Sequence, residues 1–95
     1  MKQKPAGEQV DFLRTIVEQN VRAIVEHEDE FRVECVTTPA RVALTVFVAP
    51  SDMGLVLGNE GATADAIRRI VWTACKKTSL RCDIDFMTSG RRLNI

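Results

Sequence analysis

Apolar residues recur near the start of the chain with the spacing of an amphipathic helix. Between Gln9 and roughly His27 they form one broad stripe, and charged residues fall on the opposite side. The stripe contains Phe12, Leu13, Ile16, Val17, Val21 and Ile24. This pattern predicts a helix that packs one face against a core, and the acidic cluster at residues 28–30 ends it.

Two segments then alternate between apolar and polar residues, as half-buried strands do. They span residues 31–37 and 42–48, and the second places Val42, Leu44, Val46 and Val48 on one face. The short segment between them, residues 37–40, predicts a turn and therefore an antiparallel hairpin. A third alternating segment, residues 80–86, predicts one more strand.

Two helical patterns lie between the second and third predicted strands. The first begins at Pro50, with Ser51 or Asp52 as its cap, and runs about two turns before Gly58. The second covers residues 62–78, with a core-facing stripe of Ile67, Ile70, Val71 and Ala74. The order helix, strand, strand, helix, helix, strand predicts an α+β fold whose helices cover one face of a three-stranded sheet.

The length of 95 residues suits a single domain. We expect a flexible N-terminal segment at residues 1–8, the folded domain at 9–86 and a basic C-terminal tail at 87–95. No apolar run approaches the roughly 18 residues of a membrane span, and the start of the chain lacks the apolar stretch of a signal peptide. The sequence therefore predicts a soluble cytoplasmic protein with no membrane partner.

The side chains that carry catalysis or bind metals are sparse. Cys35, Cys75 and Cys82 are an odd number without paired spacing, which predicts reduced thiols packed as small core residues. With one histidine, expected to be a charge at a helix C-terminus, neither a zinc site nor another cofactor is predicted. No carboxylate pair, Ser-His-Asp set or Cys-His pair has catalytic spacing, so we do not expect an enzyme.

The formal charge of zero conceals an uneven distribution. The net charge is −5 between Glu8 and Glu34 and +5 between Arg68 and Ile95. A neutral chain lacks the charge of a strong nucleic-acid binder, although this polarity can steer an anionic ligand or pair two copies. Five basic residues near the end of the chain have two interpretations, a second basic binding surface or merely a solvated face. They are Lys76, Lys77, Arg81, Arg91 and Arg92.

The turn Gly58-Asn59-Glu60-Gly61 lies between the two predicted helices. Glycine accepts positive φ and allows a ligand backbone to approach closely. The second glycine is at a helix start, where N–H groups without partners and the helix dipole favour a phosphate. A Gly-x-x-Gly turn also occurs as a purely structural corner, but its position between two helices and after two strands favours a nucleic-acid clamp.

The chain resembles the type II, or prokaryotic, KH domain, and more narrowly the small stand-alone bacterial KH proteins of the KhpA-like family. The resemblance covers about Phe12 to Phe86. Its specific part is Val48-Ala49-Pro50-x-Asp52-x-Gly54-x-Val56-x-Gly58-x-x-Gly61 together with Ala66-Ile67-Arg68. It implies a third strand parallel to one neighbour, cytoplasmic RNA binding linked to post-transcriptional control, and a homodimer or a heterodimer with another KH protein.

The resemblance also implies site residues. Gly58 and Gly61 match the RNA-clamping glycines, Leu57 matches an aliphatic residue of the groove floor, and Arg68 matches an arginine of the following helix. The chain departs from the family at Asn59, where a basic residue is usual, at Glu60, which adds a negative charge, and at Ala62 and Asp65. Since phosphate contacts supply most non-specific affinity, we expect weakened binding that rests on the loop N–H groups, Arg68 and Arg69.

Two hypotheses of different classes follow. The first is a single-stranded RNA-binding protein that uses residues 57–61, Arg68 and Arg69. The second is a KH-fold interaction or dimerisation module that has lost RNA binding, with an interface at Arg68, Trp72 and Cys75. Trp72 either lies over the edge of the core or anchors that interface.

Overall fold

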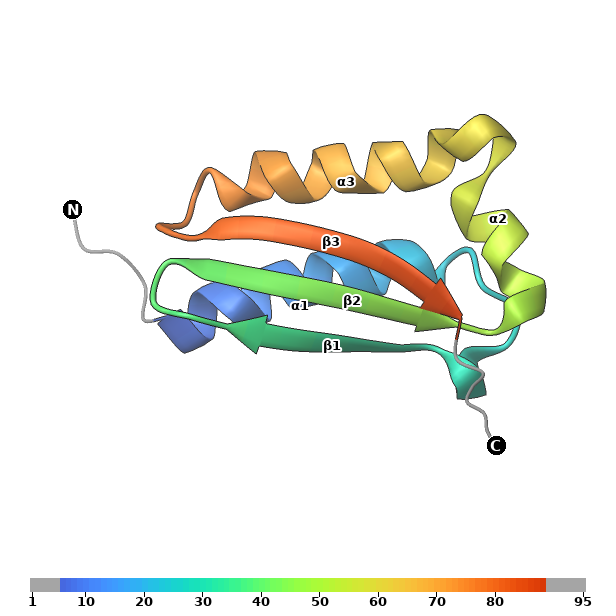
Figure 1. Cartoon of the computed structure of the whole chain (residues 1–95), viewed down its shortest axis with the longest axis horizontal. Coiled ribbons are helices and arrows are strands. Elements are labelled where there is room, and N and C mark those ends of the chain that lie inside the picture. The colour runs from blue at the N-terminus through green and yellow to red at the C-terminus, as the bar shows by residue number, and fades with distance from the viewer. Residues whose placement is uncertain (1–5, 89–95) are drawn as a thin grey trace.

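Three strands form one mixed sheet in the order β1-β2-β3, with three α-helices packed against it (Figure 1). This computed structural model describes residues 6–88. The elements are α1 (Ala6–Arg22), β1 (Arg32–Thr37), β2 (Arg41–Val48), α2 (Met53–Leu57), α3 (Ala62–Cys75) and β3 (Arg81–Thr88). Single 3-10 turns lie at Glu28–Glu30, Pro50–Asp52 and Asn59–Gly61.

The strand pairing confirms the predicted hairpin and the predicted direction of the third strand. β1 pairs with β2 in antiparallel fashion, and β3 pairs with β2 in parallel. Leu44, at the middle of β2, is opposite Cys35 on one side and Ile84 on the other. The parallel pairing requires a crossover, which α2 and α3 supply, so the Gly-x-x-Gly turn lies within this crossover.

The helices cover one face of the sheet, as the alternation of apolar residues predicts. All four apolar β2 positions that the sequence placed on one face are buried, and α1 and α3 pack beside each other over them (Figure 1). On α3 the buried side chains are Ala64, Ile67, Val71, Ala74 and Cys75. Ile70, predicted to face the core, is 43% exposed, because the buried stripe of α3 follows positions 67, 71 and 74 instead.

Several predicted boundaries were wrong. α1 begins at Ala6, so residues 6–8 are helical rather than part of a flexible segment, and it ends at Arg22 rather than near His27. α3 ends at Cys75 rather than Thr78, and β3 continues to Thr88, two residues into the predicted tail. Residues 1–5 and 89–95, with Arg91 and Arg92, lie outside the described part of the chain.

The prediction that all three cysteines are reduced was also wrong. Cys75 and Cys82 form a disulfide that joins the end of α3 to the start of β3. The short connection between these elements brings the two Cα atoms to 6.4 Å, within the range a disulfide needs. Cys35 is free and partly buried, and the Arg14 Nε donates to its Sγ over 3.3 Å.

A buried carboxylate links the end of the first helical segment to the turn after β2. The side chain of Asp52 has no exposed surface, and its Oδ2 accepts a hydrogen bond of 2.9 Å from the backbone N–H of His27. The His27 Nδ1 is 3.2 Å from Asp52 Oδ1. Asp52 therefore occupies the N-cap position of α2, one of the two predicted, but its side chain makes no capping hydrogen bond. His27 is a partner of Asp52 rather than a simple helix-terminal charge.

This contact shifts both pKa values toward the charged pair. Hydrogen bonding to Asp52 raises the pKa of His27 above its ordinary value. Burial, the largest influence on Asp52, acts to raise the pKa of its carboxyl, but the hydrogen bonds from the backbone of His27 and Glu26 and from the His27 ring outweigh it and lower the pKa. The charged pair therefore stabilises the fold in the pH range where both groups are ionised.

We expect the free energy of unfolding to be greatest in mildly acidic solution. The raised pKa of His27 contributes stability below its ordinary pKa of about 6.5, and this is lost as the pH rises through the folded value. The lowered pKa of Asp52 contributes above its ordinary value of about 3.9 and is lost as the pH falls through the folded value. Denaturant unfolding of the wild type and of His27→Gln between about pH 5 and about pH 8 measures this. The variant should lose less stability on going to the higher pH, and equal losses in the two proteins would contradict the linkage.

Candidate functional site

The Gly58–Gly61 turn combines three residues with positive φ. Gly58 has φ 71° and ψ −170°, Glu60 has φ 54° and ψ 32°, and Gly61 has φ 80° and ψ 8°. Among the non-glycine residues from 6 to 88, Glu60 alone has positive φ. This backbone reverses the chain between α2 and α3, so glycines are needed here for conformation as well as for space.

The two glycines have different surroundings. A Cβ on Gly58 would lie 2.1 Å from Oγ1 of Thr63 and 2.9 Å from its backbone nitrogen. A Cβ on Gly61 would have no atom within 4 Å. Gly58 therefore packs directly against the first turn of α3, whereas Gly61 presents bare backbone to open space, where a ligand backbone can approach.

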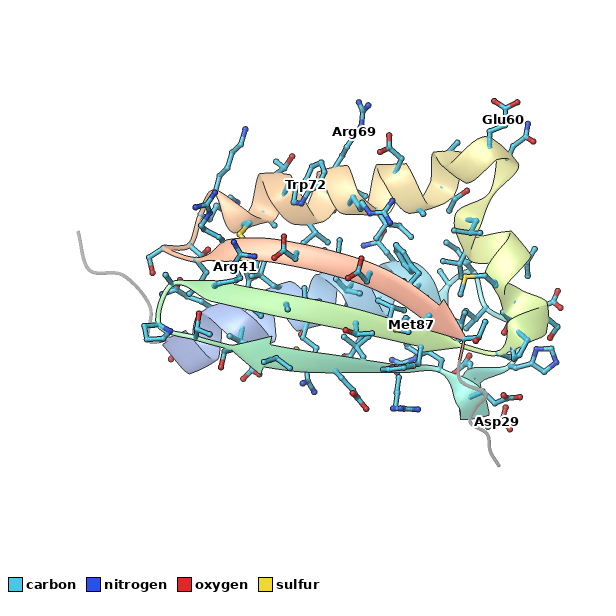
Figure 2. All side chains as sticks on the ribbon, in the orientation of Figure 1. Asp29, Arg41, Glu60, Arg69, Trp72 and Met87 are labelled. Carbon is cyan, nitrogen blue, oxygen red and sulfur yellow. A yellow bond between two sulfur atoms is a disulfide. The ribbon has the colours of Figure 1, made fainter. Side chains whose placement is uncertain are left out.

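The start of α3 is available to an anion. No side chain caps this helix, and its N-cap residue is Gly61. The first N–H groups of a helix have no partner within the helix, and the dipole is positive at this end. Within the turn, the N–H of Gly61 donates to the Gly58 carbonyl over 3.4 Å, and the N–H of Ala62 donates to the Asn59 carbonyl. The side chains of Asn59 and Glu60 are exposed beside these groups, and Figure 2 shows Glu60 projecting from the tip of the turn. The turn thus offers backbone donors next to one carboxylate.

The two predicted arginines lie on different sides of α3. The guanidinium of Arg68 lies 5.4 Å from the centre of the Phe86 ring on β3, so Arg68 is on the side that borders the sheet. Arg69 forms an exposed ion pair of 3.1 Å with Asp65 and projects away from the sheet (Figure 2). Arg68 is therefore placed near β3, while Arg69 is not.

The remaining predicted residues are divided between surface and interior. Leu57, the last residue of α2, is 40% exposed. Trp72 is 48% exposed on the side of α3 that borders β3. Cys75, predicted to continue the interface flank, is 8% exposed and bonded to Cys82, so it was wrongly assigned to an exposed interface.

Sequence reasoning missed the contribution of β3. Among residues 6–88, β3 pairs with β2 alone, so its outer edge carries backbone groups that no described strand pairs with. Phe86 was identified as a strand position, but its contact with Arg68 depends on the crossover and is invisible along the chain. A cleft of about 530 Å³ between the end of α3 and the start of β3 was also missed, because it depends on how α3 packs beside β3.

The chemical groups on these surfaces are mainly backbone donors and acceptors. In the stretch from residue 6 to 88, no cluster of three or more His, Cys, Asp or Glu side chains is arranged to hold a metal ion. None of the helices in that stretch has both the length and the apolar character needed to cross a membrane. The loop, Arg68 and the free edge of β3 together offer hydrogen-bond donors and acceptors and one cation.

Comparison with known proteins supports this description. The family profile described as KhpA/KhpB, KH domain matches residues 14–86. The chain is 35% identical to the RNA-binding protein KhpA of Halalkalibacterium halodurans over 79% of this chain and 99% of that protein. It is 32% identical to that of Clostridium acetobutylicum over 79% and 100%, and 34% identical to that of Bacillus subtilis over 77% and 90%. No solved structure gave a significant match.

The unequal surroundings of the glycines predict unequal costs of substitution. Gly61→Ala should destabilise the fold by about 1 kcal/mol, the cost of positive φ for an L-residue. Gly58→Ala should cost several times more, because the methyl group also meets the backbone of Thr63. Gly54→Ala is the matched control, since Gly54 lies within α2 with open space around its Cα, and it should stabilise by about 0.5–1 kcal/mol. Thermal unfolding of the three variants measures the order, and a Gly61→Ala variant less stable than Gly58→Ala would contradict it.

Proposed function

Because the chain belongs to the KhpA/KhpB KH-domain family, we propose that it binds single-stranded RNA through the Gly58–Gly61 turn and the adjoining side of α3. The observation that carries the proposal is the turn itself: Gly61 presents uncovered backbone at the uncapped start of α3. A KH domain clamps the backbone of about four nucleotides with such a loop. Relatives that align over nearly their whole length carry the name RNA-binding protein.

The proposed contacts differ in kind along the site. A phosphate accepts hydrogen bonds from N–H groups of the turn and of the first turn of α3 other than those of Gly61 and Ala62, which donate to the Gly58 and Asn59 carbonyls. Arg68, held against Phe86, contributes a cation on the side of α3 that borders the sheet. Bases then lie toward β3, whose free edge supplies donors and acceptors. Leu57 supplies an exposed apolar surface beside the turn.

The affinity should be low because the turn lacks a basic side chain. Asn59 donates a neutral hydrogen bond at most, and Glu60 places a negative charge where a phosphate approaches. Arg69 is paired with Asp65 and points away from the sheet, so it contributes little to the site. We propose that the binding is non-enzymatic, takes place in the cytoplasm and serves post-transcriptional regulation.

The second candidate function is assembly with a second copy or with another KH protein. The half-exposed Trp72 favours it, because a large aromatic next to Arg68 is typical of an interface centre. The opposite net charges of the two halves of the chain would aid docking of a second copy, although salt screens such attraction. In this alternative the Gly58–Gly61 turn no longer binds RNA, because of its acidic side chain.

The charge of the turn gives a direct test of RNA binding there. The Asn59→Lys, Glu60→Lys double variant should bind mixed single-stranded RNA more tightly, because a repulsion is removed and counterion release is added. The logarithm of its affinity should also fall more steeply with the logarithm of salt concentration, by about 0.7 for each new phosphate contact. Fluorescence anisotropy titrations at several salt concentrations measure both quantities.

Two further variants isolate the cause. Glu60→Gln removes the charge and keeps the shape, so it should tighten binding by a smaller amount. Asp29→Asn makes the same change in net charge at an exposed position away from the turn, and it should leave the affinity nearly unchanged (Figure 2). If the double lysine variant binds like the wild type, RNA does not contact this turn.

Sedimentation without RNA separates the assembly alternative. If assembly is the function, the wild type sediments as a dimer, and Trp72→Ala shifts it toward monomer with little loss of thermal stability, since the side chain is half exposed. If RNA binding is the function of this side of α3, the wild type and Trp72→Ala sediment alike.

A further inference from the structure

Three side chains form a row along the side of α3 that borders β3. Arg68, Trp72 and Lys76 recur every fourth residue, and residues at this spacing share one face of a helix. Arg68 lies midway along α3, and Lys76 directly follows Cys75, the last residue of the helix. With a rise of about 1.5 Å per residue, Trp72 lies about 16 Å along the helix from Gly61.

The far end of this row opens into the cleft between α3 and β3, which we call the Trp72 cleft. Its volume is about 530 Å³. It is lined by Arg41, Trp72, Cys75, Lys76, Thr78, Ser79, Leu80, Arg81, Cys82 and Asp83. The lining therefore combines the single tryptophan of the chain with three cations and one carboxylate.

The carboxylate of the Trp72 cleft is already neutralised. Asp83 forms an ion pair with Arg41 across the neighbouring strands. Within the described part of the chain, Lys76 and Arg81 make no ion pair, and both are exposed. Two uncompensated cations thus flank a half-exposed indole, an arrangement that attracts an anion bearing a flat aromatic group.

We propose that the Trp72 cleft binds a further nucleotide of the RNA strand, beyond those held at the Gly58–Gly61 turn. The base stacks on Trp72, and the adjoining phosphate contacts Lys76 and Arg81. Any base can stack on an aromatic side chain, so this subsite does not discriminate between RNA sequences. It favours RNAs that are long enough to reach from the turn to Trp72. The inference rests on the proposed function and extends its site to the opposite end of α3.

The surroundings of Trp72 favour RNA over a protein partner. A protein interface centre is depleted of lysine, whereas this indole shares its cleft with Lys76, Arg81 and the Arg41–Asp83 ion pair. A single strand also needs a continuous track, and Arg68 lies one turn before Trp72 on the way from the turn. The cations along α3 would thus contact the RNA phosphates at intervals, and Trp72 would provide one surface for base stacking at the end of the track.

The tryptophan itself is the probe for the test. The chain has one tryptophan and no tyrosine, so its intrinsic emission reports on Trp72. RNAs of about four and about ten nucleotides, each carrying a fluorescent end label, are titrated by anisotropy, and unlabelled copies are titrated by tryptophan emission. Both lengths should bind, but the longer RNA alone should quench the emission of Trp72.

Substitutions then separate stacking from charge. Trp72→Ala should weaken binding of the longer RNA by about 5- to 150-fold and leave the shorter one unaffected, while Trp72→Phe should retain most of the affinity. Lys76→Ala should reduce the salt dependence for the longer RNA by about one phosphate contact. Lys77→Ala is the matched control, because Lys77 lines a different groove with Phe12 and Ile70.

The outcomes distinguish this inference from the proposed function. If neither RNA changes the anisotropy, RNA binding itself fails and the inference with it. If both lengths bind but Trp72 emission is unchanged, or Trp72→Ala weakens both equally, the inference alone is overturned. If the Trp72 emission changes with protein concentration and not with RNA length, Trp72 lies in a protein interface. That result also overturns the inference.

Discussion

The buried contact between Asp52 and His27 is the constraint on which the position of the site depends. A single 3-10 turn, Pro50–Asp52, connects β2 to α2. The Asp52 carboxylate lies at the end of that turn and has no access to solvent. A buried carboxylate without partners would be costly, so it requires donors. The backbone of His27 provides one, and this fixes the segment after α1 against the start of α2. The start of α2, and with it the turn that follows this short helix, is therefore fixed in position both by β2 and by the segment after α1.

From this anchor the site follows through backbone conformation. α2 has only five residues, so the turn begins at Gly58, where a Cβ would collide with Thr63. Three positive φ values then orient the start of α3 outward. In the proposed binding mode the N–H groups of this backbone are the main donors, and replacing Asn59 or Glu60 by any residue other than proline leaves them in place. Under the proposed function, the acidic side chain of Glu60 changes the strength of RNA binding rather than the backbone geometry of the turn.

The side chains of α3 divide its surface into distinct roles. Ile67 and Val71 are buried against the sheet, Arg69 and Asp65 pair on the outside, and a third side faces β3 with Arg68 and Trp72. Adjacent residues such as Arg68 and Arg69 point about 100° apart on a helix, so their sequence proximity says nothing about a shared ligand. The disulfide at the end of α3 keeps this third side close to β3.

The amino-acid sequence by itself determined the elements, their order and the residues of the turn. The alternation in β2 identified its buried face, because a strand places successive side chains on opposite faces. Glycine spacing located the turn, since few other residues accept its backbone conformation. Only the tertiary structure decided which distant residues meet: His27 with Asp52, Cys75 with Cys82 and Arg68 with Phe86. The exposure of Ile70 and the Trp72 cleft also follow only from the tertiary structure. Both depend on how α3 is rotated about its axis against the sheet, and local sequence patterns carry no information about that rotation.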